Sequence, residues 1–185
     1  MSAPEAGPIT APGIDPRGPR FGAAITSALL LCAVGLSLST GASTEPQVLS
    51  ALDPLSRLAE PAALLTLGLF LLFLWGSVAG IRRHPFGLIF ARIVRPRLSP
   101  PSELEPAAPP TFAQGVGGAV VGVGLALHAL AVPFALPVAL SAAFLAAFLN
   151  AAFAFCLGCE LYLILRRFRP SRREAPAHTA ARVRN

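Results

Sequence analysis

The sequence contains no lysine, and charged residues of any kind are scarce. Only 13% of its 185 residues are charged, about half the share that is usual in soluble globular proteins. The apolar residues make up 54% of the chain and fall into long uncharged blocks, and the mean hydropathy is +0.65. This pattern excludes a single water-soluble core and indicates transmembrane helices.

Cysteine is also scarce, since Cys32, Cys156 and Cys159 are the three in the chain. Three cysteines cannot build a disulfide scaffold, and an odd number leaves at least one thiol unpaired. No catalytic serine triad, phosphate loop or haem-binding pattern is present. The glycine-rich stretch GVGGAVVGVG lies inside an apolar block, without the preceding strand that phosphate or dinucleotide binding requires. We therefore predict no bound cofactor.

Four apolar blocks are long enough to cross a hydrocarbon core of about 30 Å, for which a helix needs about 20 residues. The sequence therefore predicts an all-α fold, a four-helix transmembrane bundle. The fourth block has no breaker, and a continuous helix of its length would exceed the hydrocarbon core and must tilt or protrude. The predicted spans are residues 21–40, 62–81, 111–132 and 137–166.

Polar tails flank the predicted membrane domain, which covers residues 21–168. Residues 1–20 are rich in proline and glycine and are predicted to be a disordered tail, and residues 169–185 form a basic tail. A cleavable signal peptide is the alternative for the first block, because two arginines precede it and the small residues TGAS follow it.

A shorter amphipathic helix is predicted between the second and third spans, over residues 85–95. Phe86, Ile89, Phe90 and Ile93 follow the i, i+3, i+4, i+7 pattern of one helix face, and arginines flank this stripe. Such a helix is too short to span lipid and suits the headgroup region. Packing against the end of the bundle is the alternative.

The arginines predict the orientation of the chain. With four spans, fourteen of the fifteen arginines fall on one side, and Arg57 alone falls on the other. The positive-inside rule makes the arginine-rich side cytoplasmic, so both termini are predicted to lie in the cytoplasm. The predicted location of the protein is the inner (plasma) membrane of the cell. Nucleic-acid binding would need stacking aromatics among the arginines on a soluble face, so the lipid bilayer is the predicted partner instead.

The stretch FCLGCE near the end of the fourth block carries Cys156, Cys159 and Glu160. On a continuous helix these three side chains share an arc of about 100°, which Leu145, Leu149, Ala152 and Leu163 continue. Ala154 and Gly158 belong to a separate small-residue face. The arginine count places the pair in the cytoplasmic third of the membrane, in the middle to late part of the helix.

Three hypotheses for this cluster follow from the residues. The cysteines can be small packing residues, with Glu160 capping or pairing with an arginine. They can be a redox pair, because the C-x-x-C spacing lets one thiol be captured by the other as a disulfide and Glu160 can tune the thiolates. They can also bind a soft metal ion that is being transported through the bundle, although the sequence does not show a complete set of metal ligands.

Several stretches also resemble a known family. They are IDPRGPRF, PFGLIFARIVRPRL with the following PPSELE, PPTFAQGVG, and the cluster F-C-x-G-C-E-x-Y that ends at Tyr162. They resemble a bacterial family of small integral membrane proteins that is catalogued only as a domain of unknown function, over roughly residues 13–168. The resemblance implies a connection to thiol or sulfur chemistry, because genes for thioredoxin-like and sulfurtransferase proteins tend to lie beside those of the family. The working hypothesis is a thiol pair that exchanges electrons or sulfur with such a cytoplasmic protein.

Overall fold

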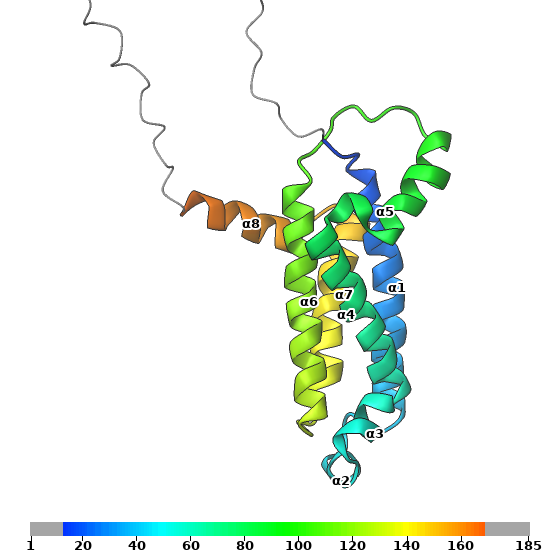
Figure 1. Cartoon of the computed structure of the whole chain (residues 1–185), viewed down its shortest axis with the longest axis vertical. Helices are drawn as coiled ribbons and strands as arrows, with labels where there is room; N and C mark the ends of the chain where they lie inside the picture. The colour runs from blue at the N-terminus through cyan, green and yellow to red at the C-terminus, as the bar shows by residue number, and fades with distance from the viewer. Residues whose placement is uncertain (1–12, 169–185) are drawn as a thin grey trace, which may run out of the picture.

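The computed structural model describes residues 13–168, and four long helices dominate it (Figure 1). By length and composition each of the four can cross a membrane. The prediction of an all-α, four-helix membrane bundle is therefore confirmed. The four helices are α1 (Arg17–Ser39), α4 (Pro61–Ala79), α6 (Ala108–Ala129) and α7 (Ala135–Phe153).

The four long helices close into a ring. Helix α1 packs against α7 and α4, and α6 packs against the same two helices from the other side. Small and apolar side chains from all four fill the centre, which explains why the blocks contain so many alanines. The buried core consists of Leu30, Ala33, Ala62, Ala63, Leu69, Phe73, Val121, Leu125, Leu136, Leu140 and Ala143.

The glycines of α6 let its neighbours approach closely. A Cβ at Gly118 would lie 3.3 Å from the Cβ of Phe73, and one at Gly122 would lie 2.8 Å from the ring of Phe70. Both phenylalanines belong to α4. The G-x-x-x-G spacing therefore serves packing within this chain.

Two short helices close one end of the bundle, α2 (Pro46–Ala51) and α3 (Pro54–Ala59) (Figure 1). Asp53 caps α3 by accepting the backbone N–H groups of Leu55 and Ser56. The buried guanidinium of Arg57 donates to the Ala129 carbonyl at 2.7 Å and to the Leu49 carbonyl at 2.9 Å. Arg57 thus satisfies carbonyls at the ends of two helices that have no intrahelical partner.

The opposite end of the bundle holds the predicted amphipathic segment. After a 3₁₀ turn (η1, Ile81–Arg83), α5 runs over Pro85–Ile89, and a π-helical turn (η2, Phe90–Val94) and a second 3₁₀ turn (η3, Arg95–Arg97) follow. Phe90 packs against Gly18 and against Phe21, whose ring centroid is 5.8 Å away. The helix therefore rests on the start of α1, while Ile89 and Ile93 stay exposed.

Residues 13–16 form an ordered segment and α1 begins at Arg17, which differs from the predicted disordered tail over residues 1–20. Ile14 pairs with Glu105 in an isolated antiparallel bridge, and Arg17 binds both Asp15, at 2.8 Å, and the Ser99 carbonyl, at 2.9 Å. These bonds order the chain up to the first turn of α1. Residues 1–12 and the predicted basic tail at 169–185 lie outside the described residues.

The fourth apolar block is not one helix, so the predicted continuous helix over residues 137–166 is wrong. Helix α7 ends at Phe153, where Ala154 adopts the left-handed conformation with φ 57° and ψ 21°. Helix α8 (Leu157–Arg167) begins after three intervening residues and leaves the bundle sideways (Figure 1). The face that the cysteine pair and Glu160 would share with Leu145, Leu149 and Ala152 on a continuous helix therefore does not exist.

Candidate functional site

Cys156 stands at the N-terminus of α8. Its backbone is extended, and its sulfur accepts the backbone N–H of Cys159 at 3.3 Å, which makes Cys156 the N-cap residue. Its carbonyl accepts the N–H groups of Cys159 and Glu160, both at 3.0 Å, and so starts the helical hydrogen-bond ladder. The helix break thus moves the cysteine pair from the predicted middle of a helix to the start of one.

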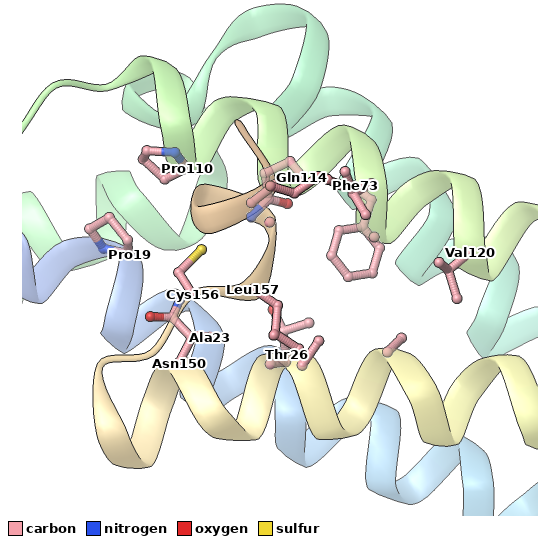
Figure 2. Close-up of a pocket in the computed structure, with 18 of the residues that line it drawn as sticks. Pro19, Ala23, Thr26, Phe73, Pro110, Gln114, Val120, Asn150, Cys156 and Leu157 are labelled. Atoms are coloured by element: carbon pink, nitrogen blue, oxygen red, sulfur yellow. The ribbon is translucent and has the colours of Figure 1, made fainter. Parts of the chain in front are cut away.

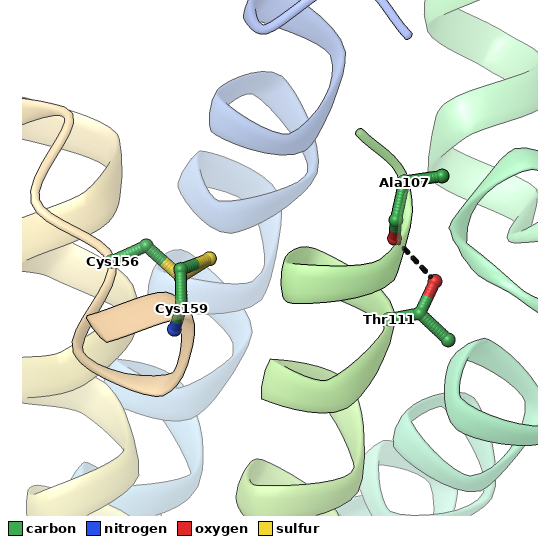
Figure 3. Close-up of a disulfide and its surroundings, with 4 residues drawn as sticks. All are labelled: Ala107, Thr111, Cys156 and Cys159. Carbon is green, nitrogen blue, oxygen red and sulfur yellow. Dashed lines mark hydrogen bonds between the residues drawn. A yellow bond between two sulfur atoms is a disulfide. The ribbon is translucent and has the colours of Figure 1, made fainter. Parts of the chain in front are cut away.

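Cys156 and Cys159 are joined as a disulfide, with their Cα atoms 5.2 Å apart. Both residues are half-buried. Figure 3 shows the disulfide beside the first turns of α6, where the Thr111 hydroxyl donates to the Ala107 carbonyl at 2.8 Å. A C-x-x-C pair at a helix N-terminus is a common setting for reversible thiol chemistry, because the N–H groups and the helix dipole favour a thiolate there.

Contacts with α6 hold α8 in place. Gly158 lies directly against Ala113, and the rings of Phe112 and Tyr162 are 5.6 Å apart. The guanidinium of Arg166 lies over the Tyr162 ring at 5.9 Å. Gly158, predicted to lie on a separate small-residue face, therefore positions the cysteine pair by letting α8 approach α6.

A cavity of about 250 Å³ extends from Cys156 into the bundle. Residues of α1, α4, α6, α7 and α8 line it, and most of their side chains are apolar. Figure 2 shows the sulfur of Cys156 at the edge of this space, near Pro19 and Pro110. The same wall contains the polar side chains of Thr26, Gln114 and Asn150.

Glu160 is exposed in the first turn of α8. A carboxylate there is favoured by the positive end of the helix dipole. It therefore needs no partner inside the bundle, and it forms no ion pair with an arginine within residues 13–168. Its side chain does not share a face with Leu145 and Leu149, because these precede the break.

The third cysteine, Cys32, is a free thiol on the exposed side of α1. Within residues 13–168 no group of three His, Cys, Asp or Glu side chains is arranged to hold a metal ion. The structure thus brings Cys156 and Cys159 together and does not join a third candidate ligand to them.

Gln114 and Asn150 share the cavity wall with Cys156 and are not among the predicted site residues. A signal for both was present, because each is an uncharged polar residue inside an otherwise apolar block. Such residues in membrane helices usually face the interior of the bundle, where packing or a ligand satisfies them. The fourth apolar block is longer than a membrane-spanning helix needs to be, and this length was a sequence signal for the break between α7 and α8.

The fold and the described helices define a multi-pass membrane protein with a cysteine pair at one end of the bundle. The chain belongs to the family described as Domain of unknown function (DUF4395), which matches residues 14–167. Neither the curated proteins nor the solved structures contain a match to this sequence.

Proposed function

We propose that the protein is a membrane thiol–disulfide relay in which Cys156 and Cys159 alternate between a dithiol and a disulfide. The observation that carries the proposal is the position of Cys156 as the N-cap of α8, with the N–H of Cys159 donating to its sulfur. This N–H and the helix dipole stabilise negative charge on that sulfur. Cys156 is therefore the attacking thiolate and Cys159 the resolving thiol.

The exchange moves two electrons without any other reactant. The Cys156 thiolate attacks a disulfide of the partner, so a mixed disulfide forms while the partner's own S–S bond breaks and its released thiolate takes up a proton. Cys159 then loses its proton and attacks the Cys156 sulfur, which releases the second partner thiol. The chain ends as the Cys156–Cys159 disulfide and the partner as a dithiol. The reverse sequence oxidises the partner.

The arginines support a cytoplasmic site. Helix α8 begins at the same end of the bundle as α5 and the start of α1. Nine of the ten arginines in the described residues lie in α1, in the segment between α4 and α6, or in α8; the tenth, Arg57, lies in α3. The positive-inside rule then favours an inner-membrane protein with this end in the cytoplasm. A cytoplasmic thioredoxin-like or sulfurtransferase protein is the partner we propose.

A redox titration of the purified protein tests the proposal. In a Cys32→Ser background, the protein is equilibrated in detergent with dithiothreitol buffers of stepped potential, and free thiols are labelled with a maleimide that adds mass. We expect a reversible two-electron transition in which two labels are gained together on reduction. A pair that stays oxidised, or that cannot be reoxidised, contradicts the proposal.

Single-cysteine variants separate the two roles. With Cys159→Ser, a partner disulfide should trap Cys156 as a stable mixed disulfide, because the resolving thiol is missing. With Cys156→Ser, we expect such an adduct at least tenfold more slowly. Equal trapping rates in the two variants would show that the start of α8 does not activate Cys156.

A further inference from the structure

We propose that the cavity beside Cys156 binds a membrane-soluble quinone, which accepts the two electrons of the reduced Cys156–Cys159 pair. This inference rests on the proposed redox function of the pair. It adds the second reactant, because a thiol relay that turns over needs both a source and an acceptor of electrons.

The size and chemistry of the cavity fit a quinone ring. Its volume of about 250 Å³ exceeds the roughly 150 Å³ of an apolar cavity that accommodates benzene. Its wall combines many apolar side chains with a few polar ones, the usual make-up of a small-molecule site. One wall residue, Phe73, offers an aromatic ring, and the cavity lies among helices that can cross a membrane, where an apolar ligand concentrates.

Two side-chain amides in the wall can donate to the carbonyl oxygens of a quinone. Gln114 comes from α6 and Asn150 from the last turn of α7. Neither side chain forms a hydrogen bond with another part of the chain within residues 13–168. Gly76 makes room for Gln114, since a Cβ there would lie 2.8 Å from the Cγ of Gln114.

A neighbouring cavity of about 450 Å³ is a poorer site for the same ligand. It shares Pro19, Thr26, Ile81 and Gln114 with the first cavity, but its wall also contains the ionisable side chains of Asp15, Arg82, His84 and Arg95, none of which lines the first cavity. Cys156 is not among its wall residues. An apolar ring that must reach the sulfur therefore belongs in the first cavity.

The proposed reaction balances in atoms and electrons. The Cys156 thiolate adds to a ring carbon of the quinone and forms a C–S bond. Cys159 then attacks the Cys156 sulfur, so the S–S bond forms while the C–S bond breaks and its electron pair stays on the ring. The two protons from the thiols end on the two quinone oxygens. The dithiol is oxidised to the disulfide and the quinone is reduced to the quinol.

The test uses the reduced Cys32→Ser protein in detergent without oxygen, with decylubiquinone and menadione as separate probes. We expect one quinone to be reduced per protein as both thiols are lost, and the faster probe identifies the preferred ring. Protein in which the pair equilibrates with dithiothreitol buffers but reduces neither quinone would overturn this inference alone. A pair that never equilibrates with dithiothreitol would contradict the proposed function itself.

Two variants locate the reaction in the cavity. Ala146→Leu fills the space from α7 and should slow quinone reduction at least tenfold, whereas Ala152→Leu on the exposed side of the same helix should leave the rate unchanged. Gln114→Leu removes one donor and should raise the quinone concentration at half-maximal rate about fivefold, as expected for one hydrogen bond. All three should keep the thiol equilibrium of the Cys32→Ser protein. An undiminished rate in Ala146→Leu, as expected if the cavity merely holds a lipid chain, would overturn the assignment.

Discussion

Gly158 at the start of α8 lies directly on Ala113 of α6. A Cβ at Gly158 would stand 2.5 Å from the Cβ of Ala113 and 2.7 Å from its Cα, closer than side chains approach one another. This contact holds the first turn of α8, and with it the cysteine pair, against the bundle. The close approach is therefore a condition for the geometry of the site.

We expect Gly158→Ala to displace α8 from α6, because one of the two clashing atoms belongs to the backbone and cannot move away on its own. The measurement is the maleimide labelling rate of the reduced pair, which should change at least severalfold for Cys156. Gly115→Ala is the matched control, since a Cβ there would lie 3.7 Å from Ser77 at ordinary contact distance. Identical labelling in both variants would show that the Gly158 contact does not position the pair.

The buried ring of His84 gives stability a pH dependence. Its Nδ1 accepts the backbone N–H of Phe86 at 3.3 Å, so the neutral ring caps α5. Burial lowers the pKa of His84 below its usual 6.5. Because the pKa in the folded protein is below that in the unfolded chain, this contribution to stability is complete above about pH 6.5 and is lost as the pH falls below it.

His84→Asn isolates the effect of this ring, because asparagine is a good N-cap that stays neutral. Thermal unfolding in detergent should show a smaller loss of stability between about pH 7.5 and 5.5 in the variant than in the wild type. A pH dependence that is the same in both proteins would show that His84 does not contribute to it.

Arg57 joins the short helices at one end of the bundle to the end of α6. Arg57→Met would leave the carbonyls of Leu49 and Ala129 without their donors, at a cost of about 2–4 kcal/mol in the free energy of unfolding. Arg83→Met is the control, because that side chain is exposed, and we expect a change below about 0.5 kcal/mol. Thermal or denaturant unfolding of both variants in the same detergent provides the comparison.

Cysteine labelling in intact cells tests the orientation of the bundle. In a background without the three native cysteines, exposed Ser50 and Ser102 are replaced in turn by cysteine. An impermeant maleimide should label Ser50→Cys from outside and Ser102→Cys only after permeabilisation, since the arginine-rich end is proposed to be cytoplasmic. The opposite pattern would place Cys156 and Cys159 at the outer end of the bundle and rule out a cytoplasmic partner.

The four spans could be predicted because a bilayer imposes a length and an absence of charge that are visible in any sequence. The break between α7 and α8 could not be predicted in the same way. Its left-handed residue is Ala154, whereas glycine or asparagine is the usual signal for that conformation. Hydropathy continues across the break, since Phe153, Phe155 and Leu157 are all apolar.

The cysteine pair was identified from its spacing, but its chemical setting was not. Whether Cys156 lies within a helix or at its start depends on the backbone conformation of residues 154–156, where Ala154 is left-handed and Cys156 is extended. The cavity beside it depends on how α1, α4, α6 and α7 pack, which a single sequence does not specify. Local spacing predicts which thiols can pair, and tertiary packing decides what they can reach.

The turn at Ala154 also provides a criterion for comparing other chains of the family. Alanine, glycine and asparagine can adopt its φ of 57°, whereas valine, isoleucine and threonine are strongly disfavoured there. A relative with a β-branched residue two positions before the first cysteine of the C-x-x-C pair would continue the helix. Both thiols would then lie in the middle of a helix and not at the start of one. The residue at that position, more than the cysteine spacing itself, would then separate the chains that place the cysteine pair at a helix N-terminus from those that share only the bundle.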